Sequence, residues 1–475
     1  MSAGADTTKK RDTAPLLWLI ALGVFMQMLD STIVNTALPS MAAGLGESPL
    51  RMQSVVIAYA LTMAMLIPAS GWLADRFGTR RTFFSAIVLF TAGSLLCAYS
   101  HTLSQLVASR VLQGIGGAML LPVGRLAVLR SVPRADFLRA MTFVTLPGLI
   151  GPLIGPTLGG WLVQIASWHW IFLINIPVGV IAGAATLRYM PDARSSVSRF
   201  DLVGYLMLSF SMVAISLSLD GLSELGLRHV TVLMLMIFGM ASFVAYWLHA
   251  TRVPSPLFPL RLFGVPSYRV GILGNLFARI GSGSMPFLIP LFFQVSLGFT
   301  PLEAGLMMVP VALAAMVSKR LVVPLIRELG YRRVLIGNTV LVGLAMASFA
   351  LISPEEPMWL RIAHLAFFGL VNSLQFTAMN TVTLNDLEGD LASGGNSLLS
   401  MVMMLSTSFG VASASALLVT FTSLFGFERG TSALPAFHAT FVCVGLITAA
   451  SAAIFWQLRP ERVPVAEPAA VAAPD

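Results

Sequence analysis

The chain has 475 residues, of which 56% are hydrophobic and only 11% are charged, and its mean hydropathy is +0.84. Such a chain cannot bury all its apolar residues inside a water-soluble core, so we expect it to lie in a lipid bilayer. The formal net charge of +8 would suit a nucleic-acid partner, but the basic residues lie in short turns between apolar runs. We therefore expect the bilayer as a partner and no nucleic acid.

Apolar runs long enough to cross about 30 Å of hydrocarbon recur along almost the whole chain. A membrane β-barrel would instead show strands of about ten residues with alternating polarity, so the runs predict helices. The predicted fold class is all-α, a polytopic membrane protein with fourteen transmembrane helices. The fourteen runs are residues 15–38, 53–74, 82–100, 104–128, 137–163, 168–190, 201–220, 230–250, 268–294, 303–326, 334–352, 358–382, 393–424 and 436–457.

The basic residues are distributed unequally between alternate turns. With the N-terminus inside, most of the 29 Lys and Arg residues fall in cytoplasmic segments, and Arg110 and Arg279 fall inside runs. The outside loops carry only Arg51, Arg228, Arg361 and Arg429. This is the positive-inside distribution, and an even number of helices places both termini in the cytoplasm. The first run is too long for a removable signal peptide and lacks a small-residue cleavage site.

Asp30 is the only carboxylate placed well inside a predicted span. Burial disfavours its charged form, whereas a nearby arginine favours that form, so small changes in exposure can decide whether it holds a proton. Gln27 and Val34 fall on the same helical face, which gives the carboxylate a polar neighbour. We expect Asp30 to couple transport to protons; a helix-packing aspartate is the alternative.

The second run ends in a compact charged turn, Gly71–Arg81, in which Gly71 and Gly78 allow tight approach and chain reversal. Asp75 can meet a helix N-terminus or an arginine there. Arg76, Arg80 and Arg81 anchor the cytoplasmic surface, and for the last two a purely topogenic role is favoured.

The same turn recurs 252 residues later, at Arg327–Arg333. The same offset aligns five residue pairs at two other sites: Gly46 with Gly298, Ser48 with Thr300, Pro49 with Pro301, Leu50 with Leu302, and Gly117 with Gly369. The sequence therefore predicts two homologous six-helix halves around two inserted helices, an arrangement common in secondary transporters. The expected segments are a tail (1–13), the first bundle (14–195), the insert (196–252), the second bundle (253–457) and a disordered tail (458–475).

Arg110 sits about two turns into the fourth predicted helix, where a guanidinium needs a partner, and Asp30 is the natural one. Gln113, Gly114 and Gly117 share its face, and the glycines would let another helix approach closely. A structural arginine that holds two helices together is the alternative.

The fifth predicted helix repeats glycine and proline every four residues, which leaves one face almost bare of side chains. We expect this face to pack closely against a helix of the opposite half. Its members are Gly148, Gly151, Pro152, Gly155, Pro156 and Gly159.

The second half offers candidates for a substrate cavity. Arg279 aligns with Gln27 and lies one turn from Ser282, the counterpart of Asp30, so it can face a central cavity. Asn372, Gln375, Phe376 and Met379 recur at helical spacing and mix polar, aromatic and adaptable apolar groups; ordinary helix packing explains them equally well. Gln27 and Gln113 complete the predicted cavity set.

Several of these motifs resemble the major facilitator superfamily, specifically its fourteen-span drug:proton antiporter branch. They are Leu29–Pro39, the Asp75 turn, Arg110–Gly117, Gly148–Gly160 and Trp168–Pro177. The resemblance implies that Arg110 couples proton release to conformational change and that the Asp75 turn acts as a latch for the outward-open state. It also implies that the glycine helix is the antiporter signature, a pivot or seal between the halves; a purely structural packing role is the alternative.

The leading functional hypothesis is a secondary active exporter in the bacterial inner membrane that exchanges protons for small molecules by alternating access. Two arginines, Arg110 and Arg279, lie inside predicted spans, but Asp30 is the only deep carboxylate. This excess of positive charge favours neutral or anionic cargo, such as carboxylate metabolites or metal–carboxylate chelates like iron citrate. A proton-coupled importer and a non-transporting membrane sensor are the alternatives. Enzymatic or ATP-driven activity is not expected, because no nucleotide loop or catalytic triad is found.

The remaining expectations concern partners and cofactors. Cys97 and Cys443 are isolated in apolar runs, so no disulfide and no metal site is indicated. We expect no cofactor, a proton gradient as the driving force, and a monomer as the functional unit.

Overall fold

The computed structural model describes residues 13–194, 200–221, 229–388, 390–425 and 433–458, and these residues are almost entirely helical. The helices are α1 (Ala14–Leu45), η1 (Pro49–Arg51), α2 (Gln53–Phe77), α3 (Thr79–Ala98), α4 (Leu103–Ser131), α5 (Arg134–Ile165), α6 (Trp170–Leu173), α7 (Asn175–Tyr189), α8 (Leu202–Gly221), α9 (His229–Ala250), η2 (Leu260–Gly264), α10 (Pro266–Val295), α11 (Pro301–Leu306), α12 (Val309–Ala347), η3 (Ser348–Leu351), α13 (Met358–Leu384), α14 (Asp390–Leu424), α15 (Leu434–Ala450) and η5 (Ser451–Gln457).

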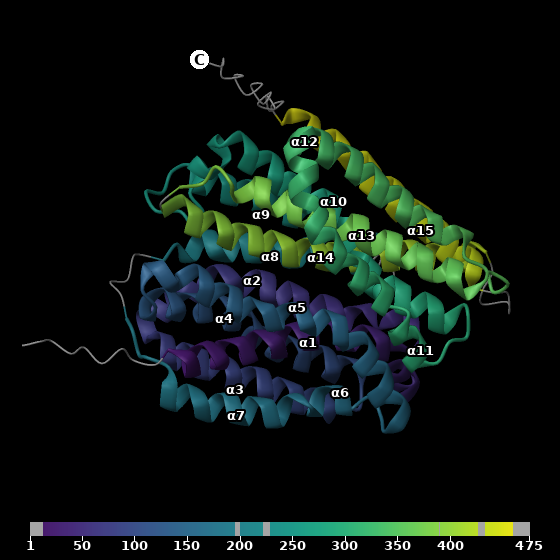
Figure 1. Ribbon diagram of the computed structural model, residues 1–475, viewed down its shortest axis with the longest axis horizontal. Helices are drawn as coiled ribbons and strands as arrows, with labels where there is room; N and C mark the ends of the chain where they lie inside the picture. Colours follow the sequence, from purple (N-terminus) through teal and green to yellow (C-terminus); the bar gives the residue numbers. More distant parts are fainter. Residues whose placement is uncertain (1–12, 195–199, 222–228, 389, 426–432, 459–475) are drawn as a thin grey trace, which may run out of the picture.

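The helices form two bundles that lie side by side (Figure 1). Helices α1 to α7 make one bundle and α10 to α15 make the other, while α8 packs against both α2 and α14 at the boundary. Helix α1 is central to the first bundle, because it contacts α4, α5 and α7 and also reaches α10 of the second. The fold thus places one helix of the first bundle, with its buried carboxylate, next to the boundary between the bundles.

Twelve helical stretches among the described residues are long and apolar enough to cross a membrane, whereas the sequence predicted fourteen. Two differences account for this. The predicted runs 303–326 and 334–352 fall in one continuous stretch of 51 residues, Pro301–Leu351. In the predicted run 137–163, the apolar stretch is Ile150–Ile165, which is shorter than a span requires.

Four glycines are the only described residues with positive φ, and they form two pairs separated by 252 residues. Gly46 and Gly298 have φ of 68° and 70°, and Gly78 and Gly330 have φ of 93° and 76°. L-residues with a Cβ rarely adopt this conformation, so glycine is needed at each position. Gly330 breaks α12 internally, as Gly78 separates α2 from α3, so the backbone repeats the turn that the sequence repeats.

The helices alternate in direction and therefore define two end faces. We call the end at which α1 begins, and at which Gly78 and Gly330 lie, the basic face, and the other end the opposite face. The two bundles are joined by hydrogen bonds toward the opposite face. Gln294 Nε2 donates to Thr36 O at 2.9 Å, and Thr157 Oγ1 donates to Gly305 O at 3.2 Å. An apolar cluster that combines residues of α1, α2, α10 and α14 lies at the same end.

Three predictions concern residues outside the described ranges. They are the N-terminal tail to residue 12, the disordered tail from residue 459, and the loop arginines Arg228 and Arg429.

Candidate functional site

Asp30 lies at the centre of a buried polar cluster built by four helices of the first bundle. Helix α1 supplies Asp30, α4 supplies Arg110 and Gln113, α3 supplies Ser94, and α7 supplies Asn175. All five side chains are buried. A charged carboxylate tolerates such burial only when a counter-charge and hydrogen-bond donors surround it, so the cluster depends on complete pairing.

The structure brings the two predicted coupling residues, Asp30 and Arg110, into direct contact. Arg110 Nη1 donates to Asp30 Oδ2 at 2.7 Å, and Gln113 Nε2 donates to Asp30 Oδ1 at 2.7 Å. The exposed fractions of the two charged residues are 0% for Asp30 and 1% for Arg110. Arg110 also donates to Gln113 Oε1 at 2.6 Å and to Val55 O at 3.4 Å, and its guanidinium lies 4.1 Å from the ring centroid of Tyr59. The ion pair is therefore sealed from solvent in this structure.

Asn175 and Ser94 complete the cluster, although the sequence gave neither a role. Asn175 Nδ2 donates to Asp30 Oδ1 at 3.1 Å and to Ser94 Oγ at 3.3 Å. Ser94 Oγ also accepts from Gln113 Nε2 at 2.7 Å. Asn175 lies in the Trp168–Pro177 motif and is the first residue of α7, directly after the short helix α6. The available signal in the sequence was that Asn175 is a polar residue within an apolar run. The sequence could not show which neighbouring helix its side chain faces.

The glycines of α4 allow α2 to approach the cluster, as expected. A Cβ at Gly114 would lie 3.1 Å from Tyr59 O, and one at Gly117 would lie 2.8 Å from Tyr59 Oη. Close backbone contact of this kind fixes the ring of Tyr59 beside Arg110.

Gln27, which was predicted to be a neighbour of Asp30, makes no hydrogen bond to it among the described contacts. Its side chain is buried and its Oε1 has no described partner. The polar neighbours of Asp30 come instead from α4 and α7, since those helices flank α1 at this depth.

Most of the glycine face of α5 packs against α1 of its own bundle, so the prediction that it packs against the opposite half holds only at its Pro156 end. A Cβ at Gly148 would lie 3.0 Å from Val24, and one at Gly151 would lie 2.8 Å from Leu29 N. The same atoms at Gly155 and Gly159 would meet the backbone of Ile33 at 3.2 Å and 2.6 Å. The glycine face of α5 therefore packs closely against α1, the helix that carries Asp30.

Contact between α5 and the second bundle is confined to one end of the helix. Thr157 Oγ1 donates to Gly305 O of α11, and the backbone of Pro156 lies against Gly305. Pro152, by contrast, is exposed. The contact of α5 with the second bundle is therefore localised at Pro156 to Gly160 and does not extend along the glycine face.

The charged turn after α2 is held within the first bundle. Asp75 accepts a hydrogen bond from Arg130 of α4, and Arg80 Nε donates to Met190 O at the end of α7. Arg76 lies over the ring of Trp72 at 5.1 Å, and Arg81 is exposed without a described partner. The close approach expected at Gly71 is absent, because a Cβ there would meet no described heavy atom within 4 Å.

The structure separates the four candidates on α13. Gln375 is buried and binds α12, since its Nε2 donates to Thr339 Oγ1 at 2.6 Å and its Oε1 accepts from Asn338 Nδ2 at 2.9 Å. Met379 is also buried, Asn372 is half-buried, and Phe376 is 44% exposed. The buried positions serve helix packing, which leaves Phe376 as the accessible aromatic group of the set.

Arg279 of α10 stacks on that aromatic ring. Its guanidinium lies 4.2 Å from the ring centroid of Phe376, and its Nε is buried without a described hydrogen-bond partner. Ser282, the counterpart of Asp30, donates only to Ala278 O of its own helix, at 3.3 Å. The second bundle thus holds a half-buried arginine, and none of the ion pairs among the described residues includes it.

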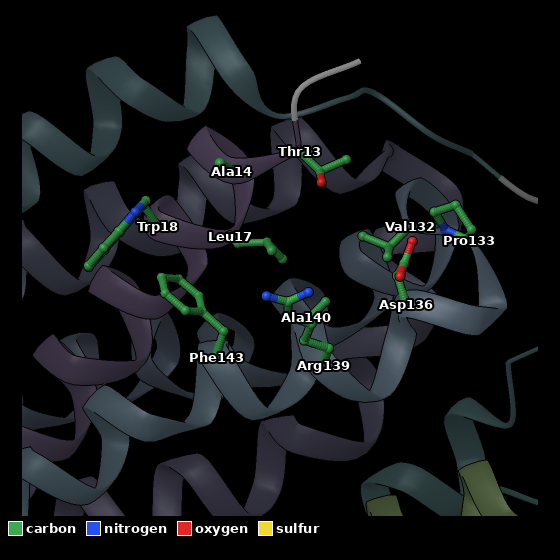
Figure 2. Close-up of a pocket in the computed structure, with 10 residues that line it drawn as sticks. All are labelled: Thr13, Ala14, Leu17, Trp18, Val132, Pro133, Asp136, Arg139, Ala140 and Phe143. Carbon is green, nitrogen blue, oxygen red and sulfur yellow. The ribbon is translucent and has the colours of Figure 1, made fainter. Parts of the chain in front are cut away.

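A separate hollow of about 410 Å³ lies at the basic face, between the first turns of α1 and α5. Figure 2 shows Leu17, Trp18 and Phe143 on its apolar side and the charged groups of Asp136 and Arg139 on the other. None of the predicted cavity residues lines it, so it is distinct from the Asp30 cluster. The described residues contain no group of three or more His, Cys, Asp and Glu side chains that could hold a metal ion.

Comparisons with known proteins agree with this architecture. The family described as "Major Facilitator Superfamily" matches residues 20–411 and 271–474. A protein of Serratia proteamaculans (strain 568), named "Putative multidrug resistance protein MdtD", is 54% identical over 443 residues, 92% of this chain and 92% of that protein. A protein of the same name from Pectobacterium carotovorum subsp. carotovorum (strain PC1) is 56% identical over 406 residues, 86% of this chain and 87% of that protein.

The fold is also found among solved structures. A POT family transporter in complex with 5-aminolevulinic acid superposes with a TM-score of 0.68 at 14% identity, covering 93% of this chain and 95% of the other. At that identity the likeness concerns the fold alone. The family match and the long relatives settle the class: the chain is a multi-pass membrane transporter and belongs to the Major Facilitator Superfamily.

Proposed function

We propose that this transporter is an exporter that exchanges protons for small molecules by alternating access, and that Asp30 carries the proton. The supporting observation is the sealed pair of Asp30 and Arg110, 2.7 Å apart inside the first bundle. Burying an ion pair in a membrane protein costs desolvation free energy, so such pairs usually mark a functional site, and proton relays are a recurrent one. The relatives named for multidrug resistance support small-molecule efflux as the task.

The topology that fits this proposal has fourteen spans in a 6+2+6 order, with the basic face in the cytoplasm of a bacterial cell. The 51-residue stretch Pro301–Leu351 is long enough for two spans when Gly330 reverses the chain, as Gly78 does between α2 and α3. Helix α5 has 32 residues and supplies the other span. Helices α8 and α9 are then the insert, and the functional unit is a monomer.

The conformation fits an inward-facing state. The described hydrogen bonds between the bundles, including Gln294 to Thr36 and Thr157 to Gly305, lie toward the opposite face. With the basic face in the cytoplasm, these contacts close the outer side. Protonation of Asp30 from outside neutralises the partner of Arg110 and favours the return to this state, and substrate then displaces the proton.

Proteoliposomes containing Asp30→Asn test the assignment. We expect substrate-driven proton movement to be lost, because the amide cannot take up a proton at neutral pH. Asp220→Asn is a matched control, since this carboxylate is also buried and bonded to Gln53, at 3.2 Å, but lies on the insert. Proton movement at the parental rate in Asp30→Asn would show that Asp30 is not the coupling group. Counterflow in oriented vesicles distinguishes export from import.

A second candidate function is export of organic anions, and Arg279 favours it. An arginine with no described carboxylate partner, stacked on an accessible aromatic ring, offers charge and ring contact to an anionic substrate. Carboxylate metabolites and their metal chelates have that chemistry.

Comparing Arg279→Lys with Arg279→Ala tests this substrate class. Loss of organic-anion transport in the alanine variant, partial recovery in the lysine variant, and unchanged transport of lipophilic cations would support it. Equal loss of anions and cations would favour a structural role for the guanidinium.

A further inference from the structure

Protonation of Asp30 leaves the buried charge of Arg110 without its carboxylate partner. A guanidinium remains charged at every physiological pH, and that of Arg110 is buried. If Asp30 is the proton carrier, as proposed above, its protonation removes the only described carboxylate in contact with Arg110. The charge must then be held by other groups, because a buried cation without partners is strongly unfavourable.

Three neighbours remain for Arg110 when Asp30 is neutral. Gln113 Oε1 accepts from Nη1 at 2.6 Å, and Val55 O accepts from Nε at 3.4 Å. The third is the face of Tyr59, whose ring centroid lies 4.1 Å from the guanidinium carbon. The ring of Phe172 is more distant, at 5.9 Å. An aromatic face attracts a cation through its quadrupole, and this attraction strengthens in a desolvated site.

Tyr59 is fixed in place by packing and not by its hydroxyl. The residue is only 4% exposed, and a Cβ at Gly117 would lie 2.8 Å from its Oη. That hydroxyl is buried and has no described hydrogen-bond partner. A buried hydroxyl without a partner is unfavourable, so the contribution of Tyr59 here must come from its ring.

We propose that the ring face of Tyr59 holds the charge of Arg110 whenever Asp30 is protonated, which makes Tyr59 a positioning residue of the proton-coupling step. Two of the three remaining partners, Tyr59 and Val55 O, belong to α2, whereas Gln113 belongs to α4 with Arg110 itself. Helix α2 contacts α14 of the second bundle. A shift of Arg110 toward α2 therefore transmits the protonation state of Asp30 to a helix that meets the other half.

The titratable and charged groups that face this site are few. Asp30 comes from α1, Tyr59 from α2, Cys97 from α3 and Arg110 from α4. The Cys97 thiol lies 3.8 Å from Gln113 Oε1, and the nearest residue from α7 is the neutral Asn175. Among the described residues, no second carboxylate is positioned to replace Asp30 as the partner of Arg110.

The first test measures the pH at which substrate-driven proton movement is half-maximal, in proteoliposomes. Loss of the ring disfavours the state with a neutral Asp30, so Tyr59→Leu should move this pH to a more acidic value by about half a unit or more. Tyr59→Phe keeps the ring and should restore the parental midpoint. Phe83→Leu, which removes a buried ring of the same apolar cluster with no guanidinium over it, should leave the midpoint unchanged. An unshifted Tyr59→Leu, or a Tyr59→Phe shifted as far, would overturn the proposal.

The second test does not depend on transport. Asp30→Asn mimics the protonated carboxyl, so Tyr59→Leu should lower the melting temperature further in that background than in the parental protein, by about 2 °C or more. Phe83→Leu should cost the same in both backgrounds. Equal effects of Tyr59→Leu in the two backgrounds would overturn the proposal. If Asp30→Asn still moves protons at the parental rate, the proposed function fails, while this thermal comparison still decides whether Tyr59 supports Arg110. Tyr59→Met serves in both tests if the leucine variant does not fold.

Discussion

Gly78 and Gly330 adopt nearly the same backbone conformation 252 residues apart, with φ of 93° and 76° and ψ of 148° and 157°. This region of φ and ψ is open to glycine and strained for all other residues. We expect Gly78→Ala and Gly330→Ala each to lower the free energy of unfolding by about 1–3 kcal/mol. Thermal unfolding in detergent measures this.

Gly337→Ala is the matched control for those two variants. Gly337 lies within α12, and a Cβ there would meet no described atom within 4 Å. Its substitution should therefore be neutral or slightly stabilising. A loss of stability equal to that of Gly78→Ala would show that the backbone conformation is not the cause.

The pairing of Asp75 with Arg130 exists only in the first bundle, because Arg327 stands at the position equivalent to Asp75. Both partners are partly exposed, so Asp75→Asn should change stability by about 1 kcal/mol or less. If the pair acts as a latch, Asp75→Asn and Arg130→Gln should slow transport to a similar extent, and the double variant no further. Arg333→Gln, in the repeated turn, should leave the rate unchanged. Additive effects of the two latch variants would show that the residues act separately.

Asn175 donates to Asp30 from α7, and this bond favours the ionised carboxylate. Asn175→Leu keeps similar volume and removes the donor, so the variant loses a hydrogen bond that stabilises the carboxylate. We expect the pH of half-maximal transport to move upward by about half to one unit, opposite to the effect of Tyr59→Leu. Asn338→Leu removes a buried asparagine that bonds Gln375 in the second bundle, and should leave this pH unchanged. An unshifted Asn175→Leu would remove Asn175 from the coupling site.

Asp201, just before α8, receives hydrogen bonds from the N–H groups of Gly204 and Leu257 and lies 2.8 Å from His249 Nε2. Burial alone raises the pKa of Asp201, but the bonds from Gly204, His249 and Leu257 outweigh it and hold the pKa below its ordinary range. Stability from a depressed carboxyl pKa is present above the unfolded-state value of about 3.9 and is lost as the pH falls through the folded-state value.

Asp201→Asn should therefore lower the melting temperature at pH about 7, and the difference from the parental protein should narrow as the pH is lowered to about 3. Asp386→Asn is the comparison, because that exposed carboxylate bonds only to Ser267 and Asn385 among the described residues. A deficit that stays constant with pH would show that ionisation of Asp201 does not contribute.

The amino-acid sequence by itself determined the features that depend on the free-energy cost of placing one residue in hydrocarbon or in a particular backbone conformation. Apolar runs identify membrane helices because unpaired polar backbone cannot lie in hydrocarbon, and Asp30 and Arg110 stand out because a charge there needs a partner. The repeated turn was visible because glycine is required at both Gly78 and Gly330. These constraints act on each residue wherever its neighbours lie.

Only the tertiary structure decided which side chains meet. The glycine face of α5 was evident in the sequence, but its main partner is α1 of the same bundle. Glycine spacing alone does not identify the partner, because such a face can pack against any helix of complementary shape. Gln375 had the character of a cavity residue and instead joins α13 to α12, while Asn175 had no assigned role and binds Asp30. Which face of a helix meets a neighbour depends on the rotation of the helix about its axis and on which helices surround it. The packing of the whole bundle sets both, so the sequence of one helix does not reveal them.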